Sequence, residues 1–122
     1  MTRPIVLLAE DDPDLSDLVA MMLEVDGVQV IAVGNGNDVL PALRLHHPDL
    51  VLLDLTLPGK DGVDVVRELR EVTDVPVLII TGFGREQGVD QALAAGATDF
   101  LLKPFRPAEL RNRVATLVHR VA

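Results

Sequence analysis

Five short apolar runs, separated by segments with helical spacing, constrain the fold of this chain more than any other feature. The runs are nearly continuous in Val, Ile and Leu, whereas a strand with one face in water alternates apolar and polar residues. Continuous runs are typical of strands that are buried on both faces of a parallel sheet. The sequence therefore predicts five strands, at residues 4–9, 28–33, 50–53, 75–80 and 100–102.

The segments that follow these runs carry apolar residues three and four positions apart, which is the spacing of a helix with one buried face. This spacing is weakest at residues 37–45. Five strand–helix units with right-handed crossovers favour a flavodoxin-like α/β fold, doubly wound, with a parallel sheet in the order 2-1-3-4-5. The other helices are predicted from Leu15, Leu18, Val19, Met22 and Leu23; from Val63, Val66 and Leu69; from Val89, Ala92 and Leu93; and from Leu110, Val114, Leu117, Val118 and Val121.

The size and composition of the chain are those of one ordinary folded domain. It has 122 residues, of which 48% are apolar and 25% charged, so it can bury a core without disulfides or a structural metal. Because no cysteine is present, disulfides, thiol nucleophiles and cysteine-ligated metal centres are excluded. We expect a single domain over residues 1–122.

The charge balance and the apolar runs also exclude several kinds of partner. A net charge of −8 and the absence of Trp and Tyr argue against direct binding of nucleic acid or an anionic membrane. No run approaches the roughly 18 apolar residues of a membrane helix, and the first residues lack a secretory signal. We therefore expect a cytoplasmic location, no membrane contact, and DNA contact only through a further domain outside this chain.

Polar residues follow four of the predicted strands at their carboxyl ends. In doubly wound sheets, ligands bind beyond this edge, near the point where the strand order reverses. The side chains expected there are Glu10, Asp11 and Asp12 after the first strand, Asp54 after the third, Thr81 after the fourth and Lys103 after the fifth.

These residues predict a metal-dependent phosphoryl acceptor. Asp11, Asp12 and Asp54 would repel one another unless a cation balanced their charge. Oxygen ligands without His or Cys select Mg²⁺ or Mn²⁺. A carboxylate can attack phosphorus, and a metal and a lysine such as Lys103 stabilise the transferred charge. Asp54 is the expected nucleophile, because it is the lone acid at the end of the central strand.

Each residue also has a simpler structural interpretation. Asp12 followed by Pro13 would make a good helix N-cap, so its carboxylate need not bind metal. Thr81 alone would suit a turn after a strand, and Lys103 alone would suit a solvated loop. The functional hypothesis depends on four strand ends supplying the needed residue types together.

At this point the chain resembles a known family, the receiver domains of two-component response regulators. The likeness covers essentially the whole sequence, and its motifs are specific in combination although weak individually. The motifs that carry it are Asp11-Asp12, residues 52–62 (LLDLTLPGKDG), Thr81-Gly82 and residues 96–105 (GATDFLLKPF).

The resemblance implies a role for each residue of the site. Asp54 would accept a phosphoryl group from the phosphohistidine of a sensor histidine kinase, and would later lose it by autodephosphorylation. Asp12, Asp54 and the carbonyl of Thr56 would coordinate Mg²⁺, with Asp11 binding through water. Lys103 would contact a phosphoryl oxygen.

The resemblance also implies a conformational switch and a characteristic peptide bond. Thr81 would move its hydroxyl toward the phosphoryl group, and Phe100 would rotate inward in the active state. The Lys103–Pro104 bond is expected to be cis, as it usually is in this family. Three positions depart from the common pattern, with Thr56 in place of Met, Gly82 in place of Ala and Phe100 in place of Tyr.

Other functions fit the sequence less well. A phosphatase of the haloacid dehalogenase type would need a second Asp two residues after Asp54 as its general acid, and Thr56 stands there. A nucleotide- or flavin-binding module would need a phosphate-binding glycine motif, which is absent. A receiver that acts only by protein interaction, without phosphorylation, would not need Asp54 and Lys103. We therefore expect no enzyme activity beyond self-catalysed phosphoryl transfer and hydrolysis.

The output is the least defined part of the prediction. Residues 103–110, followed by Arg113 and later by His119 and Arg120, resemble receivers joined to a winged-helix DNA-binding domain. A stand-alone receiver is the alternative. The subfamily resemblance implies a homodimer through the fourth helix, fifth strand and fifth helix, with Val89 or Leu93 as apolar contacts. The charged groups expected on this face are Asp99, Glu109, Arg111 and Arg113.

Overall fold

The structure, a computed structural model, describes residues 3–82 and 84–118. Within these residues, five strands alternate with five α-helices, and the strands pair in parallel in the order β2-β1-β3-β4-β5. This confirms the predicted flavodoxin-like fold. The elements are β1 (Ile5–Ala9), α1 (Pro13–Val25), β2 (Gln29–Val33), η1 (Gly36–Asp38), α2 (Val39–His46), β3 (Leu50–Asp54), α3 (Gly62–Val72), β4 (Val77–Gly82), α4 (Glu86–Ala95), β5 (Asp99–Lys103) and α5 (Pro107–Val118).

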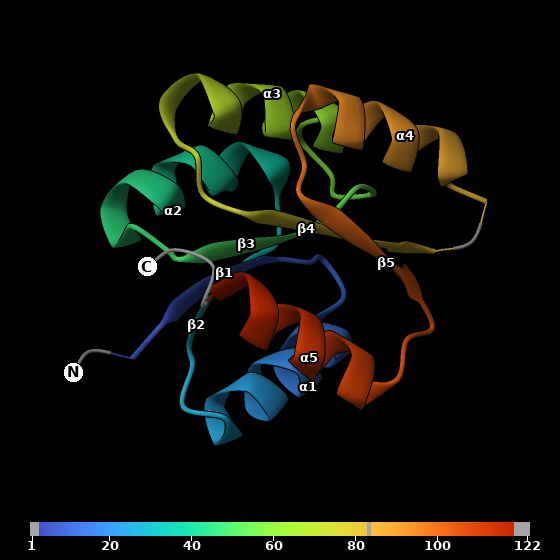
Figure 1. The fold of residues 1–122 in the computed structure, drawn as a ribbon. Coiled ribbons are helices and arrows are strands. Elements are labelled where there is room, and N and C mark those ends of the chain that lie inside the picture. The colour runs from blue at the N-terminus through green and yellow to red at the C-terminus, as the bar shows by residue number, and fades with distance from the viewer. Residues whose placement is uncertain (1–2, 83, 119–122) are drawn as a thin grey trace.

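Helices cover both faces of the sheet (Figure 1). α2, α3 and α4 lie on one face, and α1 and α5 lie on the other. Each helical layer has its own apolar core against the sheet, and the strand residues divide between the two cores by alternation along the chain. Every residue of β3 is buried, which explains why the central run contains no polar position before its last residue.

Two helices differ from the predicted ones. The weakly periodic segment forms a short 3-10 turn, η1, and then only eight residues of α2. On α1, Leu18 is 51% exposed, whereas Val19 and Leu23 are fully buried. The buried stripe of α1 is therefore narrower than the apolar spacing predicted. The predictions that concerned His119, Arg120 and Val121 lie outside the described residues.

The loop after β3 is fixed by two close backbone approaches. Gly59 has a left-handed backbone with φ of 92°, and the side chain of Asn35 occupies the space where a Cβ would lie. At Gly62, an added Cβ would lie 2.8 Å from the Cα of Leu55. Larger residues would displace the loop at either position, so these glycines hold the segment that carries Thr56 against the end of the sheet.

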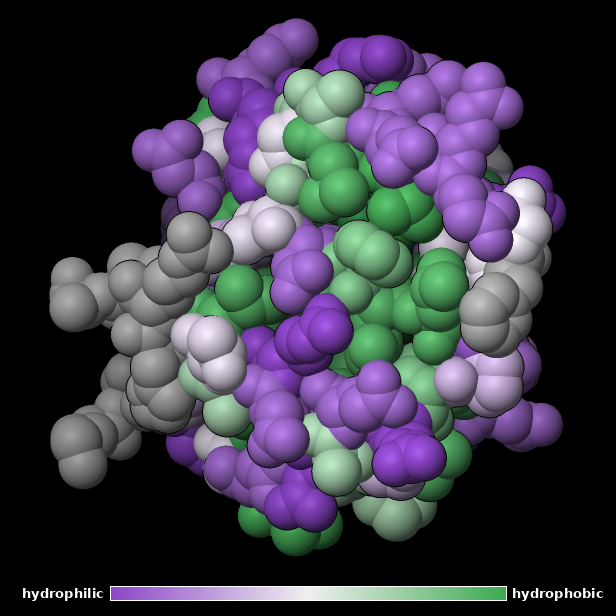
Figure 2. All heavy atoms as spheres, turned by 45° about the vertical axis from the view of Figure 1, so that its right-hand side comes forward, coloured by the Kyte–Doolittle hydropathy of each residue, from purple (hydrophilic) through white to green (hydrophobic). Residues whose placement is uncertain are grey.

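The surface is mixed on the side that carries β5 and the carboxyl ends of the strands. Figure 2 shows hydrophobic side chains gathered in the middle of this face and hydrophilic side chains around them. Among the described helices, none has the length and apolar character needed to cross a membrane.

A charged site at the carboxyl edge of the sheet

Asp54 is the last residue of β3, and its side chain is held on both carboxylate oxygens. Its Oδ1 accepts hydrogen bonds from the backbone N of Thr56 at 2.9 Å and from the Thr56 hydroxyl at 2.7 Å. Its Oδ2 accepts a hydrogen bond from the Lys103 ammonium at 2.8 Å. Asp54 is only 2% exposed, so the carboxylate is fixed in one orientation and largely removed from water.

Lys103 joins two buried carboxylates from different strands. Its Nζ lies 2.6 Å from Oε1 of Glu10, which follows β1, and 2.8 Å from Oδ2 of Asp54. β5 brings Lys103 to this position because Lys103 pairs in register with Gly82 at the end of β4. One ammonium thus serves two acids, and the site keeps an excess of negative charge.

The protonation equilibria reflect this shared lysine. Burial raises the pKa of Glu10, and its hydrogen bond from Lys103 offsets that effect only in part. Burial would also raise the pKa of Asp54, but the hydrogen bonds from Lys103 and Thr56 outweigh it and hold this pKa below its ordinary value. Burial would lower the pKa of Lys103, yet its two carboxylate partners raise it.

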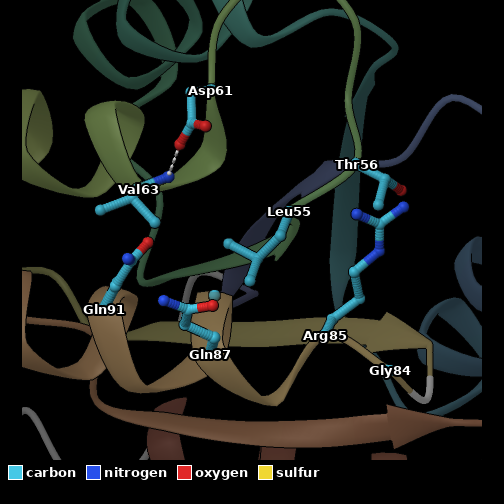
Figure 3. A pocket seen from close by; sticks show the side chains of 9 residues that line it. Leu55, Thr56, Asp61, Val63, Gly84, Arg85, Gln87 and Gln91 are labelled. Carbon is cyan, nitrogen blue, oxygen red and sulfur yellow. Dashed lines mark hydrogen bonds between the residues drawn. The ribbon is translucent and has the colours of Figure 1, made fainter.

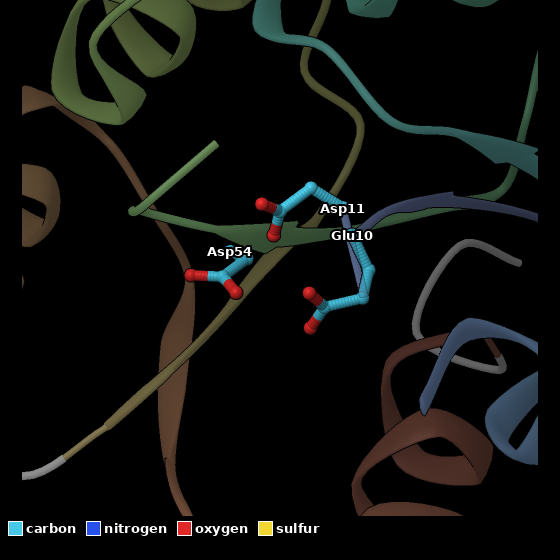
Figure 4. Close-up of side chains that lie close together, drawn as sticks. All are labelled: Glu10, Asp11 and Asp54. Carbon is cyan, nitrogen blue, oxygen red and sulfur yellow. The ribbon is translucent and has the colours of Figure 1, made fainter. Parts of the chain in front are cut away.

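Three carboxylates meet at this edge (Figure 4). Glu10, Asp11 and Asp54 each offer an oxygen within 4.8 Å of the others. Carboxylate oxygens, without His or Cys among them, are the ligands that Mg²⁺ and Mn²⁺ prefer. The chemistry of this donor set therefore fits a hard divalent cation, which would balance the charge that Lys103 leaves.

The carboxylate group differs from the predicted one by one residue. Asp12 lies outside it and instead caps α1, where its Oδ1 accepts from the backbone N of Asp14 at 3.0 Å and of Leu15 at 3.4 Å. Glu10 takes the place that the sequence had assigned to Asp12. A hydrogen bond from Glu10 N to Val33 O at 3.0 Å continues the pairing of β1 with β2 by one residue, which turns the Glu10 side chain toward Asp54.

Thr81 and Phe100 lie on the two strands next to this site. Thr81 is fully buried in β4, and its hydroxyl has no hydrogen-bond partner among the described residues. A buried hydroxyl without a partner is unfavourable, so a new hydrogen bond to the Thr81 hydroxyl would be favourable. Phe100 on β5 is 38% exposed. The Lys103–Pro104 bond is cis, as expected.

A hollow adjoins the site between the β3–α3 loop and the start of α4. Its volume is about 240 Å³, and both Thr56 and Arg85 line it (Figure 3). Arg85 occupies the N-cap position of α4 without capping the helix. The sequence had given no role to Arg85, because the direction of an exposed side chain in a loop depends on tertiary structure.

The comparisons with known proteins decide the family. Residues 6–115 match the response regulator receiver domain. The chain belongs to this family. As a receiver domain, it has the parallel sheet and the cis Lys–Pro bond that were expected, and an acidic group that contains Glu10 where Asp12 was expected.

The relatives of this receiver domain are larger regulators. It is 40% identical over 118 residues to the DNA-binding response regulator MtrA of Mycolicibacterium smegmatis, covering 97% of this chain and 52% of that protein. It is 38% identical over 117 residues to the transcriptional regulatory protein BaeR of Escherichia coli, covering 96% and 49%. The receiver domain thus spans about half the length of these relatives.

Solved structures show the same architecture. The beryllofluoride-activated N-terminal receiver domain of Klebsiella pneumoniae RstA is 32% identical with a TM-score of 0.89, and the match covers 93% of this chain and 97% of that one. A response regulator from Chloroflexus aurantiacus has a TM-score of 0.90 at 28% identity, covering 97% and 99%.

Proposed function

We propose that this receiver domain is a phosphorylation-activated switch and that Asp54 is its phosphoryl acceptor. The observation that carries the proposal is the buried Asp54 carboxylate, held by Thr56 and Lys103 beside two further acids. A carboxylate oxygen would attack phosphorus and form a new O–P bond. The bond from phosphorus to the phosphohistidine nitrogen would break, and the nitrogen would keep the electron pair.

The residues around Asp54 divide the work of this transfer. Thr56 and Lys103 orient the carboxylate, and Lys103 also supplies positive charge for the incoming phosphoryl oxygens. Glu10, Asp11 and Asp54 would hold Mg²⁺ or Mn²⁺, with the Thr56 carbonyl as a further oxygen ligand. When bound, the cation would neutralise carboxylate and phosphoryl charge.

The switch would begin at Thr81. Its hydroxyl is buried without a partner in the described structure, so a phosphoryl oxygen at Asp54 would offer the hydrogen bond that the hydroxyl lacks. Movement of Thr81 would free space next to Phe100, whose ring is partly exposed on β5. We propose that Phe100 turns inward in the phosphorylated state and changes the face formed by α4, β5 and α5.

The partners follow from the family and the relatives. A sensor histidine kinase would supply the phosphoryl group, and the domain would regulate a DNA-binding output, as the names of the relatives indicate for those proteins. The domain would not turn over external substrates, since its chemistry would be limited to its own phosphorylation and dephosphorylation.

We further propose that phosphorylation promotes a symmetric dimer through α4, β5 and α5. Val89 belongs to the buried core and is only 4% exposed, so it is not available for this contact. Leu93 and Phe100 are then the apolar candidates. Arg113 bonds Asp99 at 3.1 Å within the chain. Arg111 donates to Asp26 in two bonds of 2.8 and 2.6 Å, so it faces α1 and not the proposed dimer surface.

Two experiments test the proposal. Acetyl phosphate with Mg²⁺ should add one phosphoryl group to the wild-type domain, seen as a shifted band on a phosphate-affinity gel, and Asp54→Asn should abolish it. Undiminished labelling of Asp54→Asn would refute the assignment. Sedimentation at roughly 100 µM with and without beryllofluoride tests the dimer, because even a weak ~10 µM association would appear.

A further inference from the structure

Arg85 lies beside the site, and no hydrogen bond or ion pair with the described residues explains its position. It lines the hollow between the β3–α3 loop and α4 together with Thr56, and Figure 3 shows its side chain extending toward Thr56. Thr56 in turn donates its hydroxyl to Oδ1 of Asp54 at 2.7 Å. Thr56 therefore lies between the Arg85 side chain and the carboxylate that is proposed to accept the phosphoryl group.

Acidic neighbours do not hold Arg85 in this place. Glu86 and Asp90 lie on the same helix, yet within the described ranges Arg85 forms no ion pair or hydrogen bond with either. The Glu86 carboxylate instead accepts from the backbone N of Gly84 at 3.3 Å. A guanidinium keeps its charge at all physiological pH values and presents a planar fork that suits phosphoryl oxygens. Among the described residues, Arg85 is thus a cation without an ion pair, and its side chain is directed at the rim of the site.

The charge of the site changes in a way that calls for another cation. Glu10 and Asp54 share Lys103 as their basic partner, and Asp11 adds a third carboxylate beside them. Phosphorylation replaces one carboxylate charge by a phosphoryl group of about −1.5 to −2 and adds strong acceptor oxygens. Lys103 is already shared by two acids, so a charged donor from another direction would stabilise the added oxygens further, beside the cation and Thr81.

We propose that Arg85 is a second cationic contact for the phosphoryl group, binding its oxygens from the α4 side while Lys103 binds from the β5 side. The inference depends on the proposed function of Asp54 and extends it to donor recognition. Arg85 would bind the phosphoryl oxygens of an incoming donor and, after transfer, those of the acyl phosphate. In this role it would also attach the start of α4 to the phosphorylated residue.

The test compares Arg85→Gln and Arg85→Lys with a matched control. Arg67→Gln removes the same charge from an exposed position on α3, where Arg67 pairs with Asp64 at 2.9 Å. Two quantities are measured with Mg²⁺ present. The first is the second-order rate constant for phosphorylation by acetyl phosphate, and the second is the beryllofluoride concentration that half-saturates the amide shift of Thr81, which involves no covalent step.

Arg85→Gln should lower the rate constant and weaken beryllofluoride binding by about tenfold each, as expected for one charged hydrogen bond. Arg85→Lys should fall between Arg85→Gln and wild type, because it keeps the charge and loses the fork. Arg67→Gln should stay within about twofold of wild type. The inference is overturned if Arg85→Gln also stays within about twofold, or if Arg67→Gln falls as far.

Failure of this inference is distinct from failure of the proposed function. If Asp54→Asn abolishes labelling while Arg85→Gln behaves like wild type, Asp54 remains the acceptor and Arg85 has no part in the site. If Asp54→Asn is labelled like wild type, the proposed function fails, and the inference about Arg85 fails with it.

Discussion

Strand β3 has an aspartate at each end: Asp49 precedes its first residue, and Asp54 is its last residue. The surroundings of these two aspartates differ. Asp49 is exposed and uses Oδ2 to accept a single hydrogen bond from the backbone N of Ile5 at 2.8 Å. Asp54 is buried, bonds both Thr56 and Lys103, and lies beside two more carboxylates. The first aspartate bonds a backbone group of β1, whereas the second lies beside two carboxylates that repel it and a lysine that attracts it.

The same contrast distinguishes Thr98 from Thr81, and Arg70 from Lys103. Thr98 precedes β5 and accepts from the backbone N of Val77 at 3.0 Å, while the Thr81 hydroxyl finds no partner in the described part of the chain. Arg70 donates to backbone carbonyls of Gly96 and Val75 at 2.8 and 2.7 Å. At the amino edge, Thr98 and Arg70 satisfy backbone groups, whereas at the carboxyl edge Thr81 has no described partner and Lys103 bonds two carboxylates.

We expect the largest effect on the phosphorylation rate, in a comparison of the two half-buried basic residues, Lys103 and Arg70. Lys103→Gln should slow phosphorylation by acetyl phosphate about 100-fold, because it removes positive charge directed at the reacting group. Arg70→Gln should leave that rate unchanged and lower the free energy of unfolding by about 1–3 kcal/mol, since buried carbonyls lose their donor. Rate measurements and urea unfolding on both variants check this. Equal loss of rate in both would remove the distinction between the edges.

The next effect concerns the two aspartates after β1. Asp11→Ala should weaken Mg²⁺ binding about tenfold or more, because Asp11 belongs to the carboxylate group. Asp12→Ala should bind Mg²⁺ like wild type and lose about 1 kcal/mol of stability, as expected for an N-cap. Calorimetric Mg²⁺ titration and thermal unfolding of both variants provide the test. Weakened binding in Asp12→Ala would restore the metal role that the sequence assigned to it.

The two threonines should respond to the same substitution with opposite signs. Thr81→Val removes a buried hydroxyl without a partner and should raise the free energy of unfolding by up to about 1 kcal/mol. Thr98→Val leaves the backbone N of Val77 without its acceptor and should lower it by about 1 kcal/mol. Chemical denaturation in the presence of a chelator measures both. A loss of stability in Thr81→Val would mean that its hydroxyl already has a partner.

The smallest effect is a pH dependence at Glu10. Its pKa is raised in the folded state, so the folded protein binds this proton more tightly than the unfolded chain does. The stability from this group is full below the unfolded pKa, near 4.5, and is lost as pH rises through the higher folded pKa. Without divalent cations, Glu10→Gln should therefore be more stable than wild type at pH 7, by on the order of 1 kcal/mol. The difference should shrink as pH falls toward 4, and a difference independent of pH would contradict this account.

Much of the fold and part of the site could be predicted from the sequence, for physical reasons. Uninterrupted apolar runs have few ways to be buried other than in a parallel sheet, and that sheet places Asp54 and Lys103 at one edge. The choice between Glu10 and Asp12 could not be made, because one further ladder bond decides which side chain faces the site. Arg85 was also missed, since nothing in the local sequence fixes where an exposed arginine at the start of a helix points.

The central claim is that Asp54 alone, among the acids of this chain, accepts the phosphoryl group. Borohydride reduces an aspartyl phosphate to homoserine, so the domain can be phosphorylated with acetyl phosphate and Mg²⁺, reduced, digested and mapped by mass spectrometry. We expect homoserine at position 54 only, none in Asp54→Asn, and a wild-type yield in Asp49→Asn, the matched change at the other end of β3. Homoserine at Asp11 or Asp12, or an unchanged yield in Asp54→Asn, would contradict the account.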